Sequence, residues 1–455
     1  MIMGNITNKL TGFFQARLGE RTELKKVIRN TGWLIGDNVA RLILGAAVGV
    51  WMARYFGPTQ YGIFNYGLAY VALFSSLMSL GLDNIVIREI VKDKAATNRI
   101  LGSTFFLKIF AGVATFAVIV ASVVLTKSMD SLTKGIIIIL ASSYIFYAFD
   151  TIGFWFQSEI KSKFVIYSKL GSFVFISLLR IFFLVAGAKL VTFAWLALAE
   201  IALGEIGLVL VYFLNKQQIS KWQVSFAQMK KLLTDSWPLV FSGIAVIIYM
   251  KIDQIMIGNM LGAAEVGIYS VAVKLSEIWY FVPMAIGSSV FPSIVALRKI
   301  SKELYLSRMQ SFYDIMIWMA ILIAAPVAFF SKDIIAFVYG SQYVGAGPVL
   351  AIYIWAGVAI FLGVASEQYL LAENYIKISF VRALIGGISN VVLNFYLIPK
   401  YGIIGSAWAT LISYTISTFS LVFFRQTSGN FVMFLKTLNI LRLFRTGISI
   451  IKNKD

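Results

Sequence analysis

Fourteen charged side chains lie within long apolar segments of this 455-residue chain. The six basic ones are Arg41, Lys108, Arg180, Lys251, Lys274 and Arg382, and the eight acidic ones are Asp37, Asp150, Glu200, Glu205, Asp253, Glu277, Asp314 and Glu367. A charge at the centre of a bilayer costs at least about 2.5–3.5 kcal/mol, so such residues must face protein or water. Four of them are near segment ends and are expected to reach the interface: Lys108, Asp150, Asp314 and Glu367.

Two pairs among the deeper charges have helical spacing. Asp37 and Arg41 are four residues apart, and Lys274 and Glu277 are three apart, so each pair lies on one helical face. Such a pair either neutralises itself and fixes helix packing, or it lines a polar cavity. The sequence leaves both possibilities open.

Other deep charges have no same-face partner on their own segment. Lys251 and Asp253 are two apart and cannot point the same way. Arg180 and Arg382 share their segments with no acid, which favours an anionic ligand over an ion pair. The predicted anion-binding residues are therefore Arg41, Arg180, Lys251, Lys274 and Arg382.

The chain contains neither cysteine nor histidine. This excludes thiol chemistry, disulfides and metal sites built from cysteine or histidine. Any proton or sodium coupling must then use carboxylates, and the candidates are Asp37, Asp253 and Glu277. The sequence indicates no catalytic residue, metal site or cofactor, and we expect that the protein is not an enzyme.

The apolar segments number about twelve, and each is long enough to cross a bilayer. Hydrophobic residues make up 59% of the chain and charged residues 13%, too few charges for a soluble surface of this size. No connection is long enough for a nucleotide-binding domain, and the G-x-x-x-x-G-K-[ST] loop is absent. The sequence predicts an all-helical integral membrane protein with segments at 32–53, 61–82, 101–125, 134–156, 164–187, 190–214, 236–260, 266–291, 309–330, 346–370, 376–397 and 402–424.

The distribution of basic residues predicts the orientation of these segments. Of the 40 Lys and Arg residues, 28 fall on one predicted side and six on the other. Positively charged loops stay in the cytoplasm, so both termini are expected there, in a multi-pass protein of the cell membrane. The N-terminus does not resemble a cleaved signal peptide. Nucleic acid is not an expected partner, because the charge is spread over every loop on that side.

The sequence repeats with an offset of 205 residues: residues 57–64 read GPTQYGIF and residues 262–269 read GAAEVGIY. Glycine tolerates positive φ at tight turns. Two halves of six segments in the same orientation predict a repeat axis along the membrane normal. The aligned glycines, expected at tight turns that could take part in gating, are Gly57 with Gly262 and Gly62 with Gly267.

Pro283 is expected to kink the segment 266–291, because proline removes a backbone hydrogen bond, and a kinked, charged helix suits a moving gate. The predicted domains are a basic N-terminal segment 1–31, an N-terminal lobe 32–214, a cytoplasmic linker 215–235, a C-terminal lobe 236–424 and a basic tail 425–455.

Three sequence stretches carry a resemblance to a known family: RYFGPTQYGIF at 54–64, GLDNIVIREI at 81–90 and the repeated turn at 262–269. Over residues 30–424 the chain resembles Wzx-type polysaccharide and O-antigen flippases of the multidrug/oligosaccharidyl-lipid/polysaccharide exporter superfamily. The resemblance implies two six-helix lobes that form a V around a central cavity, lined by the first two helices of each lobe.

The same resemblance implies a function. A lipid-linked oligosaccharide, carried on a polyprenyl diphosphate, would pass from the cytoplasmic to the outer leaflet by alternating access, for surface polysaccharide biosynthesis. The basic residues would hold the diphosphate and acidic sugars. Membrane lipids, a glycan polymerase and glycosyltransferases are the other implied partners. The chain departs from a purely cationic cavity, since its deep acids roughly match its bases in number.

Three alternatives remain at this stage. A cation-coupled drug antiporter of the same superfamily would use the deep acids for cationic substrates. A lipid II flippase typically carries two extra segments. A membrane-embedded glycan polymerase or ligase would need a long outside loop, and the longest expected one, 331–345, is short.

Overall fold

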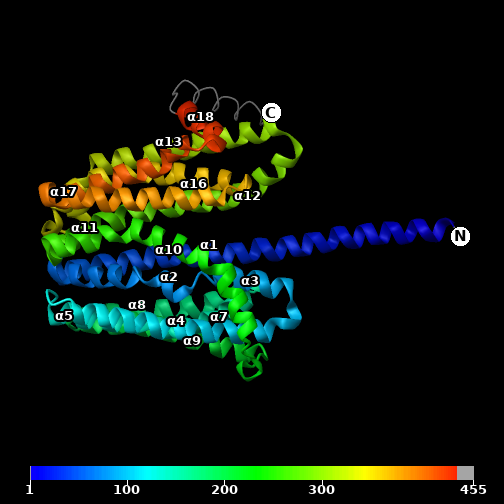
Figure 1. The fold of residues 1–455 in the computed structure, drawn as a ribbon, viewed down its shortest axis with the longest axis horizontal. Helices are drawn as coiled ribbons and strands as arrows, with labels where there is room; N and C mark the ends of the chain where they lie inside the picture. Colours follow the sequence, from blue (N-terminus) through cyan, green and yellow to red (C-terminus); the bar gives the residue numbers. More distant parts are fainter. Residues whose placement is uncertain (1, 438–455) are drawn as a thin grey trace. The chain divides into compact units, whose positions relative to one another are not determined.

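The computed structural model describes residues 2–437, which form helices, 3-10 turns and short connections and include no strand (Figure 1). The predicted all-helical class is confirmed. The chain divides into two compact units. Of the described residues, the first unit comprises 2–48, 77–125 and 138–237, and the second comprises 49–76, 126–137 and 238–437. The predicted domain boundaries stay a prediction.

Four of the described helices have residues in both units, and the two longest of these are α1 (Ile2–Ala72) and α10 (Phe226–Leu261). The first unit also contains α3 (Asp83–Lys92), α4 (Thr97–Leu125), α6 (Ser143–Phe146), α7 (Asp150–Ser158), α8 (Lys163–Val185) and α9 (Leu190–Leu214), with the 3-10 turns η1 (Lys94–Ala96), η2 (Tyr147–Phe149) and η3 (Ile219–Lys221). Helix α5 (Ser131–Ala141) begins in the second unit and ends in the first.

The second unit contains α11 (Ala263–Glu277), α12 (Phe281–Ile300), α13 (Lys302–Phe329), α14 (Ser331–Tyr339), α15 (Ala346–Tyr353), α16 (Ala356–Ala372), α17 (Ile376–Phe419) and α18 (Ser428–Thr437). Its 3-10 turns are η4 (Ile278–Tyr280), η5 (Ser341–Tyr343), η6 (Ser420–Phe423) and η7 (Arg425–Thr427). Helix α2 (Ser75–Ser79) lies where the chain returns to the first unit.

Nine helical stretches among the described residues are long and apolar enough to cross a membrane. Two of them, Gly36–Ala72 and Lys377–Phe423, each overlap two predicted segments. Each contains one glycine whose backbone dihedral angles are not helical: Gly57 has φ 68° and Gly402 has φ 61°. The predicted segment 266–291 is divided into α11, η4 and α12, with Pro283 in the first turn of α12. The number of twelve crossings stays a prediction.

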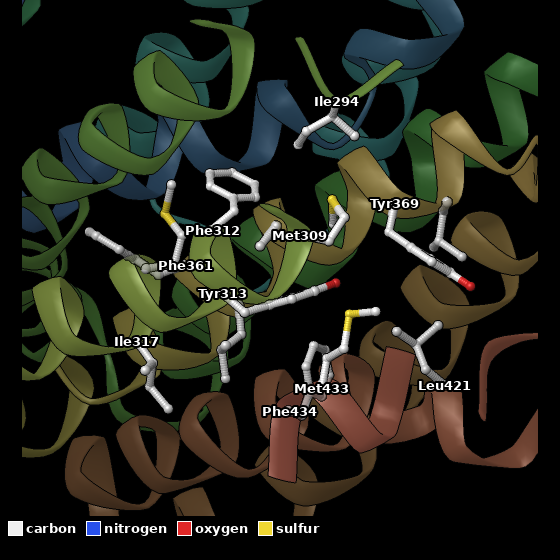
Figure 2. Close-up of a cluster of buried hydrophobic side chains, with 14 of the residues drawn as sticks. Ile294, Met309, Phe312, Tyr313, Ile317, Phe361, Tyr369, Leu421, Met433 and Phe434 are labelled. Carbon is white, nitrogen blue, oxygen red and sulfur yellow. The ribbon is translucent and has the colours of Figure 1, made fainter. Parts of the chain in front are cut away.

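A buried apolar cluster from α12, α13, α16, α17, η6 and α18 forms the core of the second unit (Figure 2). Within it, the ring of Phe434 on α18 lies 5.1 Å from the ring of Tyr313 on α13. The Tyr313 hydroxyl donates to Asn430 Oδ1 at 3.0 Å. The first part of the predicted basic tail is therefore packed against α13, while residues 438–455 of that tail lie outside the described residues.

The predicted linker packs against the first unit. The backbone N–H of Gln223 donates to the carbonyl of Asn98 at 3.1 Å, and a Cβ added at Gly102 would lie 2.4 Å from the Gln223 carbonyl oxygen. At the start of α10, Lys231 donates to the buried carboxylate of Glu89 on α3. This hydrogen bond lowers the pKa of Glu89. The segment 215–235 is thus anchored to the first unit by backbone and charged contacts.

Candidate functional site

Asp37 and Arg41 form the predicted same-helix pair on α1, within the first unit. Arg41 Nε donates to Asp37 Oδ1 at 2.9 Å, and the guanidinium lies 5.1 Å from the centre of the Phe173 ring on α8. The two side chains keep 29% and 18% of their surface exposed, Arg41 being the more exposed. Arg41 is therefore paired but accessible, which is what an exchangeable anion contact needs.

Two bases that have no acid on their own segment are paired across helices. Arg180 on α8 contacts Glu200 on α9 at 2.8 Å, and Arg382 on α17 contacts Glu367 on α16 at 2.9 Å. Arg382 also donates to the Ser366 hydroxyl. The expectation that these bases favour an anion over a pair is wrong for this structure. Spacing along one segment does not register an acid on the neighbouring helix, and the part of these two arginines in substrate binding stays a prediction.

Lys251 and Lys274, both in the second unit, have different partners. Lys251 Nζ on α10 lies 3.6 Å from Glu277 Oε2 on α11. Lys274 Nζ donates to the hydroxyl of Tyr61 at 2.7 Å and lies 4.7 Å from the centre of its ring. The Lys251 side chain is 29% exposed and its ion pair is long, so this base remains accessible.

Asp253 is buried inside the second unit among neutral polar groups. Its Oδ1 accepts from Asn394 Nδ2 at 2.6 Å, and its Oδ2 accepts from the hydroxyls of Tyr269 at 2.7 Å and Thr410 at 2.5 Å. Asn394 Oδ1 is buried beside this network and has no hydrogen-bond partner among the described residues. One carboxylate surrounded by neutral oxygens is the ligand chemistry of hard cations. The sequence indicated Asp253 alone, because its partners lie on α11 and α17, distant in the chain.

The two repeated turns contact each other within the second unit. A Cβ at Gly62 would lie 1.7 Å from the Ala263 carbonyl oxygen, and a Cβ at Gly267 would lie 2.0 Å from the Pro58 carbonyl oxygen. We call Gly62, Ala263, Gly267 and Pro58 the glycine clasp. Gly57 and Gly262 have φ of 68° and 99°, as expected for tight turns. Gly62 and Gly267 lie in helical backbone, and close approach, not positive φ, requires glycine there.

Arg54, which directly follows the predicted segment 32–53, binds the end of another helix of the second unit. Its guanidinium donates to the carbonyls of Phe337 and Val338, at 2.8 Å for Val338, near the C-terminal end of α14. The hydroxyl of Tyr343 donates to the carbonyl of Ala53 at 2.9 Å. A cation at a helix C-terminus satisfies the last carbonyls and complements the helix dipole. No periodicity links residue 54 to residue 338, so the sequence carried no signal for this contact.

Two charges predicted to reach the interface are buried instead. Lys108 on α4 is 1% exposed, and its Nζ lies 4.7 Å from the centre of the Phe154 ring on α7. Asp314 on α13 is 9% exposed and accepts from Gln310 at 2.9 Å. Helix packing covers both positions, although each is near a segment end. This expectation was therefore wrong for Lys108 and Asp314.

Comparison with known proteins identifies a family and a relative of this chain. The chain matches the family described as polysaccharide biosynthesis protein over residues 27–298. A relative, probable flippase AglR of Haloferax volcanii, is 24% identical over 415 residues, which cover 87% of this chain and 82% of that protein.

Two solved structures share the fold. An inward-facing multidrug resistance MATE family transporter of the MOP superfamily has a TM-score of 0.70 at 14% identity, covering 91% of this chain and 96% of that one. The lipid II flippase MurJ has a TM-score of 0.68 at 17% identity, covering 91% and 93%. At these identities the two structures establish the shared fold.

Proposed function

The chain belongs to the polysaccharide biosynthesis protein family, and from that premise we propose that it is a membrane flippase for a lipid-linked oligosaccharide. The match to a relative named as a probable flippase, over most of both chains, supports this function. The protein would move its substrate without changing it chemically, so no catalytic group is required. A glycan polymerase and the glycosyltransferases that build the oligosaccharide are its expected functional partners.

The observation that carries this proposal is the presence of accessible bases inside membrane-length helices. Arg41 and Lys251 each keep 29% of their side chain exposed. A diphosphate head cannot cross hydrocarbon without partners for its charges. We infer that these two bases contact the diphosphate or acidic sugars. Arg180, Lys274 and Arg382 would join them only by leaving Glu200, Tyr61 and Glu367.

Flipping in reconstituted vesicles tests this function. The probe is a fluorescent short-chain polyprenyl-diphosphate oligosaccharide, and flipping is read from loss of fluorescence to an impermeant quencher. Losing a hydrogen bond to a charged group costs about 1.5–3 kcal/mol, so Arg41→Ala and Lys251→Ala should each slow flipping about tenfold or more. Arg41→Lys should rescue only partly, because bidentate contact is lost.

Lys127→Ala is the matched control for the vesicle assay, because Lys127 lies in a connection between α4 and α5. This variant should flip at the wild-type rate. If both Arg41→Ala and Lys251→Ala also flip at that rate, the basic-contact hypothesis is wrong. If the wild type does not move the probe at all but expels a cationic dye, the flippase function itself is wrong.

A cation-coupled drug antiporter is the second candidate function. It is favoured by the buried Asp253 centre and by the fold shared with a multidrug transporter. The two functions need not use different ion sites. We propose that Asp253, with Asn394 and Thr410, binds a coupling cation such as sodium in either case, and that Asp37 and Glu277 remain alternative coupling carboxylates.

The orientation inferred from the basic loops also belongs to this proposal. Both termini and the segment 215–235 would face the cytoplasm. Because the chain has no native cysteine, single cysteines at Ser128 and Ser341 should react with an impermeant reagent added outside cells, and one at Ser220 should not. The opposite labelling pattern would reverse the orientation and the direction of transport.

A further inference from the structure

Charged side chains from four helices of the first unit, α4, α7, α8 and α9, lie close together. Lys169 on α8 binds the carboxylate of Asp150 on α7, and its Nζ lies 3.2 Å from Glu205 Oε1 on α9. Lys108 on α4 lies 4.0 Å from Asp150 Oδ2. Its Nζ also lies 3.9 Å from Asp83 Oδ1. Each of the two ammonium groups is therefore shared by two carboxylates.

Glu205 differs from Asp150 in how its oxygens are satisfied. Its side chain is 3% exposed, and its buried Oε2 has no hydrogen-bond partner within residues 2–437. An ionised carboxylate in such a place loses its hydration, and its ion pair with Lys169 compensates only in part because Lys169 also binds Asp150. A protonated carboxyl has no net charge to solvate and gains a donor hydroxyl. Geometry therefore favours the protonated form of Glu205 in this conformation.

The acids of the cluster differ in their access to water. The side chain of Asp83 is 59% exposed and that of Asp150 is 20% exposed, whereas that of Glu205 is 3% exposed. Of the three acids, Glu205 therefore loses the most hydration as an ion. The other titratable groups near Glu205 are Tyr147 on η2 and Glu200 on its own helix, and Arg180 neutralises Glu200.

We propose that Glu205, together with Asp150 and Lys169, forms a proton-binding site in the first unit, separate from the Asp253 centre of the second unit. The proton resides on Glu205 while Lys169 is shared between the two acids. When α8 and α9 shift so that Lys169 turns fully to Glu205, the proton leaves as H⁺ and the carboxylate becomes the partner of the ammonium. This inference deepens the proposed function by naming a site at which transport would respond to pH.

Infrared difference spectroscopy after a pH jump tests the site on the purified full-length protein, with no substrate present. The wild type should show the carbonyl band of a protonated carboxylic acid, which disappears as the pH rises. Glu205→Gln should lose this band. The matched control Glu200→Gln, five residues earlier on the same helix, should keep it. An unchanged band in Glu205→Gln overturns the proposal.

A second variant covers the case in which Glu205→Gln does not fold. Glu205→Asp retains a carboxyl group in a different position, so its band should remain but move in frequency, and an unmoved band overturns the proposal. Because no substrate takes part, this result is independent of flipping. A missing band would refute the proton site alone, whereas an intact band with no vesicle flipping would refute the flippase function alone.

Discussion

A single methyl group at the glycine clasp should open the contact between the two repeated turns. In Gly267→Ala the new Cβ would lie 2.0 Å from the Pro58 carbonyl oxygen, and in Gly62→Ala it would lie 1.7 Å from the Ala263 oxygen. Contacts of this kind are essentially never closer than 3.0 Å. The helices must therefore separate by about 1 Å or more, because the obstructing atoms are backbone and cannot rotate away. Overpacking of this kind costs about 1–3 kcal/mol.

The rate at which a buried thiol reacts reports this opening. Ala53 is fully buried, and its carbonyl accepts from Tyr343 near the clasp. Since the chain has no native cysteine, Ala53→Cys provides a single thiol that a maleimide reaches only when the contact opens. A loss of about 1–3 kcal/mol should raise the labelling rate about 5- to 150-fold in either glycine variant.

The control for this experiment is Gly357→Ala on α16. A Cβ there has its nearest contact at 3.8 Å, to the Tyr280 ring, which is ordinary van der Waals distance. Labelling of Ala53→Cys in this background should match the parent protein. If Gly62→Ala and Gly267→Ala label no faster than this control, the clasp is not a tight contact in the membrane protein and the reasoning fails.

Three further predictions concern charge. The hydrogen bond from Lys231 lowers the pKa of Glu89, so its stabilisation is complete above the unfolded-state value of about 4.3 and is lost as pH falls through the lower folded value. Thermal unfolding across acid pH should show that loss in the wild type and not in Glu89→Gln. Sodium at 100 times its Kd should stabilise the wild type by about 2.7 kcal/mol and leave Asp253→Asn unchanged, and equal shifts would exclude Asp253 as the site. Arg54→Ala should cost about 0.3–1 kcal/mol and speed hydrogen exchange in η5, while unchanged exchange would show that the cap is unimportant.

The helices could be predicted from the sequence because their cause is local. An apolar stretch of bilayer length must satisfy its own backbone, and only a helix does so within one segment. The break at Gly57 could also be predicted, because glycine tolerates the positive φ that a tight turn requires. The 205-residue repeat identified the glycines, but not that two of them serve close approach and two serve positive φ.

The charged contacts could not be predicted in the same way. Arg180 and Glu200 are twenty residues apart on antiparallel helices, and their pairing depends on the rotation of α8 against α9, which periodicity does not fix. The partners of Asp253 could not be predicted from the sequence either, because Asn394 and Thr410 are both more than 140 residues away along the chain. Spacing along the sequence predicts pairs on one helix, such as Asp37 with Arg41, but it does not predict contacts between helices.

The glycine clasp explains why the internal repeat preserves glycine at equivalent positions. Under the 205-residue offset, Pro58 corresponds to Ala263 and Gly62 corresponds to Gly267. The contact of Gly62 with the Ala263 carbonyl and that of Gly267 with the Pro58 carbonyl are therefore the same contact seen from each half. Such reciprocity is the signature of a local two-fold axis, where residue i contacts j and j contacts i. A side chain introduced in one half would separate both turns, so each half requires the glycine of the other.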